Sequence, residues 1–299
     1  MNLSRSVARW LGHRHHLRFA IKHRVLTALH NPNKASGELF TTQFFGLTYH
    51  GRFNSYIDWC IYYMGAYARH ELLFLKTVAQ QLSTASVFID VGANVGNHSL
   101  FASSVFGQVY SFEPLPWLVD KLDQQRQRNG ITNLHVFPYA LGEQDTRQAF
   151  YSSTVANEGI GTLIEGREAN TASIVEVDVR QGDGFLAQAG IEQIDVIKID
   201  VEGFERHVLN GLSETIRQHQ PIIFFEWSEE AAATNAPLTQ QPYFDGYTFY
   251  RFDYGRTVGL FFERDRFTLI PISILVPDYN YVAVPTEKLA SLLPYVEKT

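Results

Sequence analysis

Cysteine is nearly absent from this chain of 299 residues, where Cys60 is the only one. A single thiol permits neither a disulfide within the chain nor a metal cluster held by cysteines. This usage fits a reducing compartment, so we predict a cytoplasmic protein. Long apolar runs are also missing. None reaches the ~18 residues of a membrane-spanning helix, and we expect no secretory signal because the first residues lack a continuous apolar core.

Acidic residues are missing from one end of the sequence, where the first of them is Glu38. Seven Arg and Lys residues precede it, so residues 1–37 carry a charge of +7. The remainder has 18 basic against 31 acidic residues, a net charge of −13. An acidic body is unsuited to wrapping nucleic acid, because it repels the phosphates. We therefore expect no nucleic-acid partner.

The basic segment, residues 1–37, is the first of three predicted regions. Its apolar residues recur at roughly helical spacing from Leu3 to Leu29, between basic residues and several histidines. This pattern predicts a basic amphipathic helix. Such a helix can pack on the acidic body or on a partner subunit, or contact an anionic membrane surface peripherally. A mitochondrial presequence has a similar composition. The sequence leaves these alternatives open, together with the oligomeric state.

Aromatic residues concentrate in the second predicted region, residues 38–85. Ten of them lie between Phe40 and Tyr67. We expect most to fill a core between this region and the main domain. A minority would wall the pocket of an acceptor molecule, because aromatic faces suit the apolar faces of sugars.

The third region, residues 86–299, begins with the stretch that organises it. An apolar β-branched run ends in Asp90, and Gly92, Asn94 and Gly96 follow before an apolar helical pattern resumes. This order predicts a strand, a tight turn and a helix start. Glycine and asparagine accept positive φ, and open α/β sheets bind nucleotide-like ligands at such turns. The turn is therefore a candidate ligand site.

Further apolar runs, separated by helical patterns, predict more strands. Their near-uniform apolar character favours a parallel sheet covered by helices on both faces. We expect parallel strands at 108–113, 134–138, 194–200 and 222–227. Closing antiparallel strands are expected at 247–252, 258–263 and 279–284. Two more strands, at 150–154 and 173–179, flank a loop at 157–168 whose composition fits a mobile flap.

Glu113 ends the second of the parallel strands, 21 residues after Gly92. An acid there can accept two hydrogen bonds from a ribose diol held beside the glycine turn. Dinucleotide enzymes use similar spacing, so an NAD(P)-dependent oxidoreductase is one alternative. The turn, however, reads Gly-Ala-Asn-Val-Gly instead of Gly-x-Gly-x-x-Gly, and Asp90 precedes it. This extra carboxylate repels a pyrophosphate but attracts a sulfonium cation with its amino-acid ammonium group.

Four blocks of the sequence resemble the FkbM-type S-adenosylmethionine-dependent methyltransferases. They are residues 88–96, 112–114, 140–142 and 197–205, and the last, Ile-Lys-Ile-Asp-Val-Glu-Gly-Phe-Glu, is the most specific. The resemblance implies a class I methyltransferase fold: a Rossmann-like α/β fold with a seven-stranded, mostly parallel sheet, one reversed strand and helices on both faces. It also implies S-adenosyl-L-methionine as cofactor and O-methylation of a hydroxyl group on a small molecule or glycan.

The resemblance also assigns cofactor-binding residues by position, and Glu71 stands where the family has a glutamate. It places the methionine part of the cofactor against Asp90, Gly92, Asn94 and Gly96, with Asn97 beside them, the ribose hydroxyls on Glu113, and the adenine along Ala140 and Leu141.

Methyl transfer to a hydroxyl group requires alignment of the acceptor oxygen, and a base where the hydroxyl must lose its proton. The candidate bases are Asp200, Glu202 and Glu226, with Asp200 preferred and with His98 and His207 as weaker candidates. Carboxylates at a helix start can instead cap free N–H groups, and three of them can share a divalent cation. The sequence lacks the Asp/Asn-Pro-Pro-Tyr motif of nucleic-acid amine methylation. A cofactor-binding adaptor without catalysis is the remaining alternative.

Overall fold

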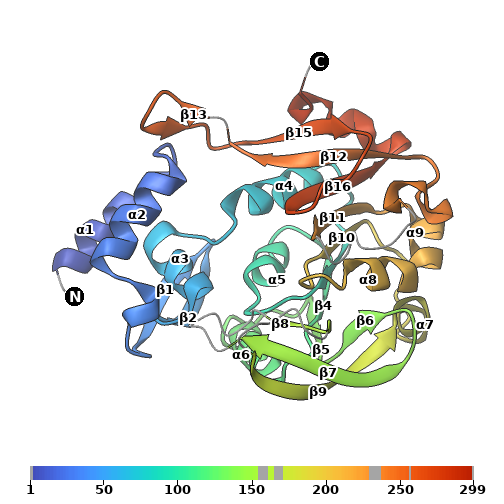
Figure 1. Ribbon diagram of the computed structural model, residues 1–299, viewed down its shortest axis with the longest axis horizontal. Coiled ribbons are helices and arrows are strands. Elements are labelled where there is room, and N and C mark those ends of the chain that lie inside the picture. The colour runs from blue at the N-terminus through green and yellow to red at the C-terminus, as the bar shows by residue number, and fades with distance from the viewer. Residues whose placement is uncertain (1–2, 154–160, 165–170, 229–236, 256, 298–299) are drawn as a thin grey trace.

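The computed structural model describes residues 3–153, 161–164, 171–228, 237–255 and 257–297, which are arranged around a mixed β-sheet (Figure 1). Five neighbouring strands of this sheet are parallel, as predicted. In order across the sheet they are β11 (Ile222–Trp227), β10 (Val196–Ile199), β3 (Val87–Val91), β4 (Gln108–Phe112) and β5 (Leu134–Phe137). Their carboxyl ends therefore meet at one edge of the sheet.

Three C-terminal strands continue the sheet beyond β11. They are β16 (Tyr279–Pro285), β12 (Tyr247–Tyr254) and β15 (Phe267–Ile272), each antiparallel to the strand before it. In the described part of the chain the sheet thus has eight strands, two of them reversed. The expectation of seven strands with one reversed is therefore wrong, because it lacked one reversed strand. The missed strand is β15, whose apolar pattern Pro271 interrupts. Proline is tolerated there because β15 lies at the edge of the sheet.

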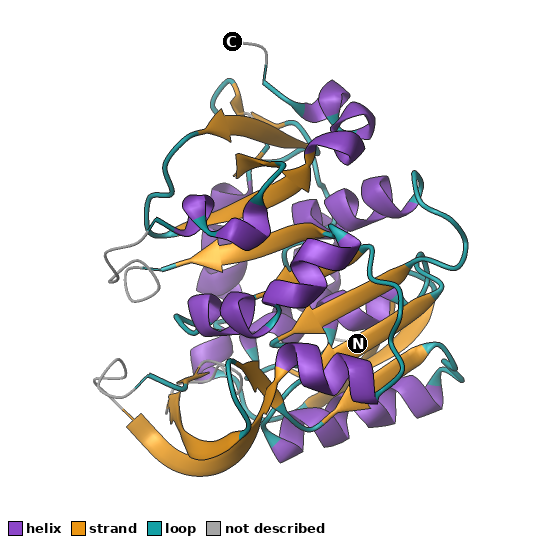
Figure 2. Ribbon diagram, turned by 90° about the vertical axis from the view of Figure 1, so that its right-hand side faces the viewer, coloured by secondary structure: helices purple, strands orange, loops and turns teal. Residues whose placement is uncertain are grey.

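Helices cover both faces of the sheet, as the apolar strands predicted (Figure 2). Phe88 and Ile89 are adjacent and fully buried, yet they belong to different apolar clusters, because successive strand side chains point to opposite faces. The cluster of Phe88 includes residues of α4 (Arg69–Ala79), α5 (Asn97–Ala102) and α6 (Pro116–Arg128), and that of Ile89 includes residues of α7 (Gly182–Gln188), α8 (Glu205–Gly211) and α9 (Ser213–His219).

A smaller sheet lies beside the main one (Figure 1). Its strands, in spatial order, are β6 (Ala140–Gly142), β9 (Thr171–Gln181), β7 (Thr146–Ser153) and β8 (Gly161–Thr162). The strands predicted at 150–154 and 173–179 thus fall largely within β7 and β9. Of the loop predicted at 157–168, only residues 161–164 lie among the described residues.

The N-terminal segment forms two helices, α1 (Leu3–Gly12) and α2 (Phe19–Leu29), so the prediction of one helix from Leu3 to Leu29 is wrong. A Cβ added at Gly12 would lie 2.0 Å from the carbonyl oxygen of Tyr63, which shows how closely α1 approaches α3 (Tyr56–Met64). The chain turns between the two helices. In this turn the N–H of Arg18 donates to the carbonyl oxygen of Phe261, and the carbonyl oxygen of His16 accepts from the N–H of Glu263.

Apolar contacts join the N-terminal helices to the rest of the chain. Ala8 of α1 and Leu26 of α2 belong to the same apolar cluster as Phe88 of the main sheet. The hairpin of β1 (Leu39–Phe44) and β2 (Leu47–Arg52) lies between α2 and α3 in the sequence. Of the alternatives left open by the sequence, the structure thus shows packing on the body of the same chain.

The strand predicted at 258–263 does not join the main sheet. It forms a separate hairpin of β13 (Thr257–Val258) and β14 (Phe262–Glu263), in which Gly259 has φ +66°. Its tip, Leu260 and Phe261, is exposed instead of buried. Short 3-10 segments complete the fold at Pro32–Lys34, Leu238–Gln240, Pro242–Phe244, Thr286–Ser291 and Leu293–Tyr295. Within the described residues, no helix combines the length and apolarity needed to cross a bilayer.

Candidate active site

A cavity of about 240 Å³ lies at the carboxyl ends of β3, β4, β10 and β11. Segments from three other parts of the fold also contribute to its walls. Tyr56, Tyr67 and Glu71 come from the N-terminal part, Ala140 and Phe150 from the smaller sheet, and Tyr254 and Asn280 from the closing strands. Tyr56 and Tyr67 are the two of the ten predicted aromatics that reach this cavity, whereas seven of the others are buried in the apolar core.

The glycine turn after β3 forms one wall of the cavity, as predicted. Gly92 has φ +83° and Asn94 has φ +53°, so the turn uses the left-handed conformation that the sequence favoured. A Cβ added at Gly92 would lie 2.0 Å from the carbonyl oxygen of Asp200. The absence of a side chain at Gly92 thus lets this turn approach the chain that follows β10.

Glu113 lies next to this turn, at the tip of β4. Its carboxylate accepts hydrogen bonds from the backbone N–H groups of Asn94 at 2.8 Å and Leu115 at 3.0 Å. Burial raises the pKa of Glu113 to about 7, although these two bonds act in the opposite direction. Each carboxylate oxygen keeps a further lone pair, so Glu113 can still accept hydrogen bonds from a ligand.

Three of the predicted cofactor residues do not line the cavity. Asp90 is fully buried and accepts a hydrogen bond of 2.5 Å from the hydroxyl group of Ser99. Gly96 has φ +87°, and a Cβ there would lie 2.2 Å from Leu122, so its place is set by packing. Leu141 points into the apolar core. We therefore correct the position expected of these three residues, which are buried instead of lining the cavity.

Asn97 does reach the cavity, at the start of α5. Its amide NH₂ group donates to the carbonyl oxygen of Tyr67 at 3.1 Å. Its side-chain oxygen is buried and has no hydrogen-bond partner within the described residues. A buried acceptor of this kind is costly unless a ligand donor satisfies it.

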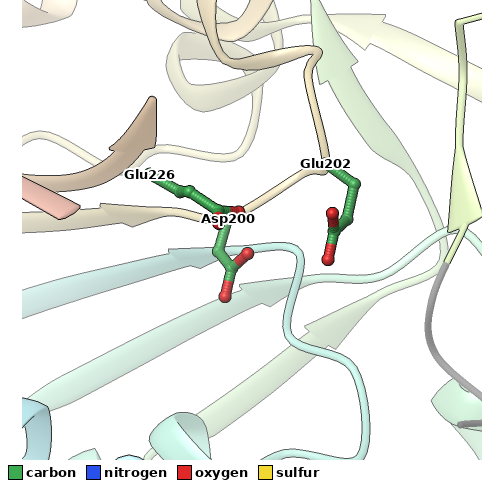
Figure 3. A group of neighbouring side chains, drawn as sticks. All are labelled: Asp200, Glu202 and Glu226. Atoms are coloured by element: carbon green, nitrogen blue, oxygen red, sulfur yellow. The ribbon is translucent and has the colours of Figure 1, made fainter. Parts of the chain in front are cut away.

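The three predicted bases come together where the cavity meets the carboxyl ends of β10 and β11. Ligand oxygens of Asp200, Glu202 and Glu226 all lie within 4.8 Å of one another. Figure 3 shows Asp200 and Glu202 on the loop after β10, while Glu226 reaches toward Asp200 from β11. Because β10 and β11 are parallel neighbours, the acids at their carboxyl ends meet although 26 residues separate Asp200 from Glu226 in sequence.

These acids differ in charge because their surroundings differ. Burial acts to raise the pKa of Asp200, but the Lys198 ammonium at 3.0 Å outweighs it and holds that pKa below its ordinary value. Burial and the neighbouring carboxylates, Asp200 first among them, raise the pKa of Glu226 to about 8. The raised pKa of Glu226 favours its protonated form, which can donate a hydrogen bond to the ionised Asp200.

Phe204 is the N-cap residue of α8, and its side chain makes no capping hydrogen bond. The carboxylate nearest the start of this helix bonds instead to the loop before it. Glu205 accepts hydrogen bonds from the backbone N–H groups of Val201 at 3.2 Å and Gly203 at 3.0 Å. The Asp200 carboxylate instead faces Lys198 and the cavity. The alternative in which Asp200 serves as a helix cap therefore loses its support.

The sequence did not predict a polar group on the cavity wall that is centred on Glu71. The Glu71 carboxylate bonds to His98 Nε2 at 2.8 Å and accepts a hydrogen bond from the phenol of Tyr254 at 2.7 Å. Asn280 also bonds to Tyr254. Glu71 stood out in the sequence only through the family resemblance, and no local pattern in the sequence marks Tyr254 or Asn280. His207, by contrast, pairs with Glu143 outside the cavity.

Comparison with known proteins identifies the family. Residues 90–253 match the model of the methyltransferase FkbM domain. The chain belongs to the FkbM methyltransferase family. This confirms the resemblance inferred from the four sequence blocks, and it places the glycine turn, Glu113 and the three acids within the FkbM domain.

Two curated relatives of this FkbM-family chain have similar levels of identity. The hexuronic acid methyltransferase AglP of Haloferax volcanii is 26% identical over 157 residues, which are 52% of this chain and 62% of the relative. The 2-O-methyltransferase NoeI of Sinorhizobium fredii is 26% identical over 160 residues, 48% of this chain and 64% of the relative. The chain thus matches less than two thirds of the length of either relative.

Among solved structures, the methyltransferase FkbM from Methylobacillus flagellatus KT is 21% identical to this chain. The alignment covers 48% of this chain and 33% of that one, with a TM-score of 0.35.

Proposed function

We propose that this chain transfers a methyl group from S-adenosyl-L-methionine to a hydroxyl group of a sugar or another small molecule. The observation that carries this proposal is the meeting of two acidic groups at one cavity of an FkbM domain. Glu113 stands beside the glycine turn, and the Asp200, Glu202 and Glu226 cluster lies in the same cavity at the carboxyl ends of β10 and β11. Glu113 is suited to binding a ribose, and the three-acid cluster is suited to a cationic methyl donor and a hydroxyl acceptor.

The residues around the cavity fit this cofactor. Glu113 offers oxygen acceptors to ribose hydroxyls, and the unpartnered side-chain oxygen of Asn97 offers one to an ammonium group. Among the described residues that line the cavity, Lys198 is the only Lys or Arg. The excess of carboxylates favours a sulfonium cation and opposes the pyrophosphate of NAD, so the oxidoreductase alternative is disfavoured.

In the mechanism we propose, Asp200 is the base. S-adenosyl-L-methionine supplies an electrophilic sulfonium methyl group when it is bound. Asp200 accepts the proton that the acceptor hydroxyl loses when it is methylated. Lys198 keeps Asp200 ionised before the reaction, and the protonated Glu226 orients its carboxylate by a hydrogen bond. Glu202 lines the same wall and is placed to hold the acceptor.

A sugar is the acceptor that the cavity supports best. Tyr56 and Tyr67 present aromatic rings at its wall, with ring centres 6.1 Å apart. Aromatic faces pack well on the apolar faces of sugar rings, and carboxylates bind their hydroxyl groups. One curated relative is named for methylation of a hexuronic acid and another for 2-O-methylation, which supports the same substrate class.

Two measurements test the proposal. Calorimetric titration with S-adenosylhomocysteine and with NAD asks which cofactor binds, and we expect the former alone. A panel of sugars and small hydroxyl compounds with labelled methyl donor then identifies the acceptor. Binding of NAD without S-adenosylhomocysteine would reject the proposal, and cofactor binding without transfer to any acceptor would favour the adaptor alternative.

A further inference from the structure

Helix α1 is packed with its apolar stripe facing outward. Leu3, Val7 and Trp10 recur along one side of the helix and are 79%, 57% and 61% exposed. On the opposite side, Ala8 and Gly12 are buried against the body of the protein. An amphipathic helix on a globular surface normally buries its large apolar residues. Within the described residues, the outward stripe therefore lacks the burial that would account for its composition.

The basic residues of α1 face the body of the protein, although such residues normally face solvent. Arg5 makes two hydrogen bonds to the Glu38 carboxylate, at 2.7 and 2.8 Å, and its guanidinium lies over the ring of Phe53. Arg9 lies over the ring of Tyr62 in the same way. These contacts anchor α1 by its polar side. The stripe is thus held outward by specific interactions with the rest of the chain.

A second exposed apolar element adjoins these helices. In the hairpin of β13 and β14, Leu260, Phe261 and Phe262 are 75%, 60% and 48% exposed. The backbone N–H of Arg18, between α1 and α2, donates to the carbonyl oxygen of Phe261 at 2.9 Å. The N–H of Phe19 donates to the Glu263 carboxylate, also at 2.9 Å. Figure 1 shows the hairpin and the two helices on the same side of the molecule.

The charge around these two elements is positive. Arg14 lies 4.4 Å from the ring of Trp10, and Arg24, Arg264 and Arg266 are exposed. Neither α1 nor α2 contains an acid. The hairpin region has two acids, but both are engaged: Glu263 by the N–H of Phe19, and Asp265 by Arg69 at 2.9 Å.

We propose that α1 and the hairpin tip form a docking surface for an anionic lipid bilayer. The docking surface consists of Leu3, Val7, Trp10, Leu260, Phe261 and Phe262. Apolar side chains that enter the lipid interface beside arginines that meet anionic headgroups are the features of peripheral membrane binding. A second copy of this chain is a poorer partner, because a symmetric contact through this surface would bring the same arginines together.

Sedimentation of the full chain with lipid vesicles tests this proposal. We expect binding to phosphatidylcholine vesicles that contain phosphatidylglycerol, weaker binding to phosphatidylcholine alone, and a decline with salt. The double variant Trp10→Glu and Phe261→Glu should bind the anionic vesicles at least about tenfold less, because two apolar contacts are lost. Ile174→Glu is the matched control, since Ile174 is 62% exposed on β9 in the smaller sheet.

The outcomes separate this inference from the proposed function. No binding of the native chain to anionic vesicles overturns it, and so does an equal loss in the Ile174→Glu control. A dimer in sedimentation velocity that Trp10→Glu dissociates assigns the surface to a second copy and also overturns it. Far-UV circular dichroism and thermal melting report whether the variants remain folded, whichever cofactor the chain binds. Should the double variant unfold, Leu260→Glu replaces it, because Leu260 is 75% exposed.

Discussion

The phenol of Tyr254 donates a hydrogen bond of 2.7 Å to the carboxylate of Glu71, across 183 residues of sequence. The same carboxylate lies 2.8 Å from His98 Nε2. Tyr254 is the last residue of β12, just before the hairpin that carries the apolar tip. The bond therefore ties a C-terminal strand to α4 at the wall of the cavity.

Replacement of Tyr254 by Phe should lower the free energy of unfolding by about 1.5–3 kcal/mol, because the phenol loses its hydrogen bond to a carboxylate and its contact with Asn280. Urea denaturation measures this change. Tyr279→Phe is the control, since Tyr279 is similarly exposed but does not line the cavity. Equal effects of the two substitutions would show that the bond to Glu71 contributes nothing specific.

Replacement of Glu113 by Ala should weaken binding of S-adenosylhomocysteine by about 1.5–3 kcal/mol, the net value of hydrogen bonds to a charged group. Calorimetric titration measures the affinity. Glu143→Ala removes an acid that pairs with His207 outside the cavity and should leave the affinity unchanged. Unaltered binding by the Glu113 variant would mean that this acid does not hold the ribose.

Asp200→Asn should reduce turnover by about 10²–10⁴-fold, the usual contribution of a positioned base, while the cofactor still binds. The comparison of kcat with the dissociation constant of S-adenosylhomocysteine checks both parts. Asp178→Asn, at an exposed position on β9, serves as the control. Normal turnover with a lowered melting temperature would assign Asp200 a structural role instead.

Stability should fall as the pH rises from about 4.5 to about 8, in part because of Glu226. The pKa of Glu226 in the folded protein is about 8, against 4.5 for an ordinary glutamate. Between these values the unfolded chain releases a proton that the folded chain retains, so unfolding becomes easier with rising pH. Melting temperatures across this range should decline less steeply for Glu226→Gln. An identical slope in both proteins would contradict the raised pKa.

Gly92→Ala should destabilise the fold by about 1–3 kcal/mol more than Gly190→Ala. Both glycines have positive φ, of +83° and +69°, so both substitutions carry the cost of the left-handed conformation. Only at Gly92 does the added Cβ meet a backbone atom, the carbonyl oxygen of Asp200, whereas nothing lies within 4 Å at Gly190. Thermal or urea unfolding of the two variants gives the difference. Equal losses would show that the turn can shift away from β10.

The sequence by itself determined the features that depend on neighbouring residues. Apolar β-branched runs identified the five parallel strands, and the glycine and asparagine after Asp90 identified the turn. Glu113 was found because its distance from Gly92 follows from one strand–helix–strand unit. The same reasoning placed Asp200 and Glu226 at the carboxyl ends of central strands, and the structure showed that these two strands are neighbours. Local periodicity predicts strands, turns and helices because backbone geometry sets the direction of each side chain relative to its near neighbours in sequence.

Only the tertiary structure decided how distant segments meet. The structure contains β15, which the sequence did not predict. It also shows that Asp90, Gly96 and Leu141 do not line the cavity, and that Tyr254 contacts Glu71. It also turned the apolar stripe of α1 outward, which the hydrophobic pattern alone would have placed inward. Contacts of this kind depend on packing between segments that the sequence separates, and no spacing rule along the chain encodes them.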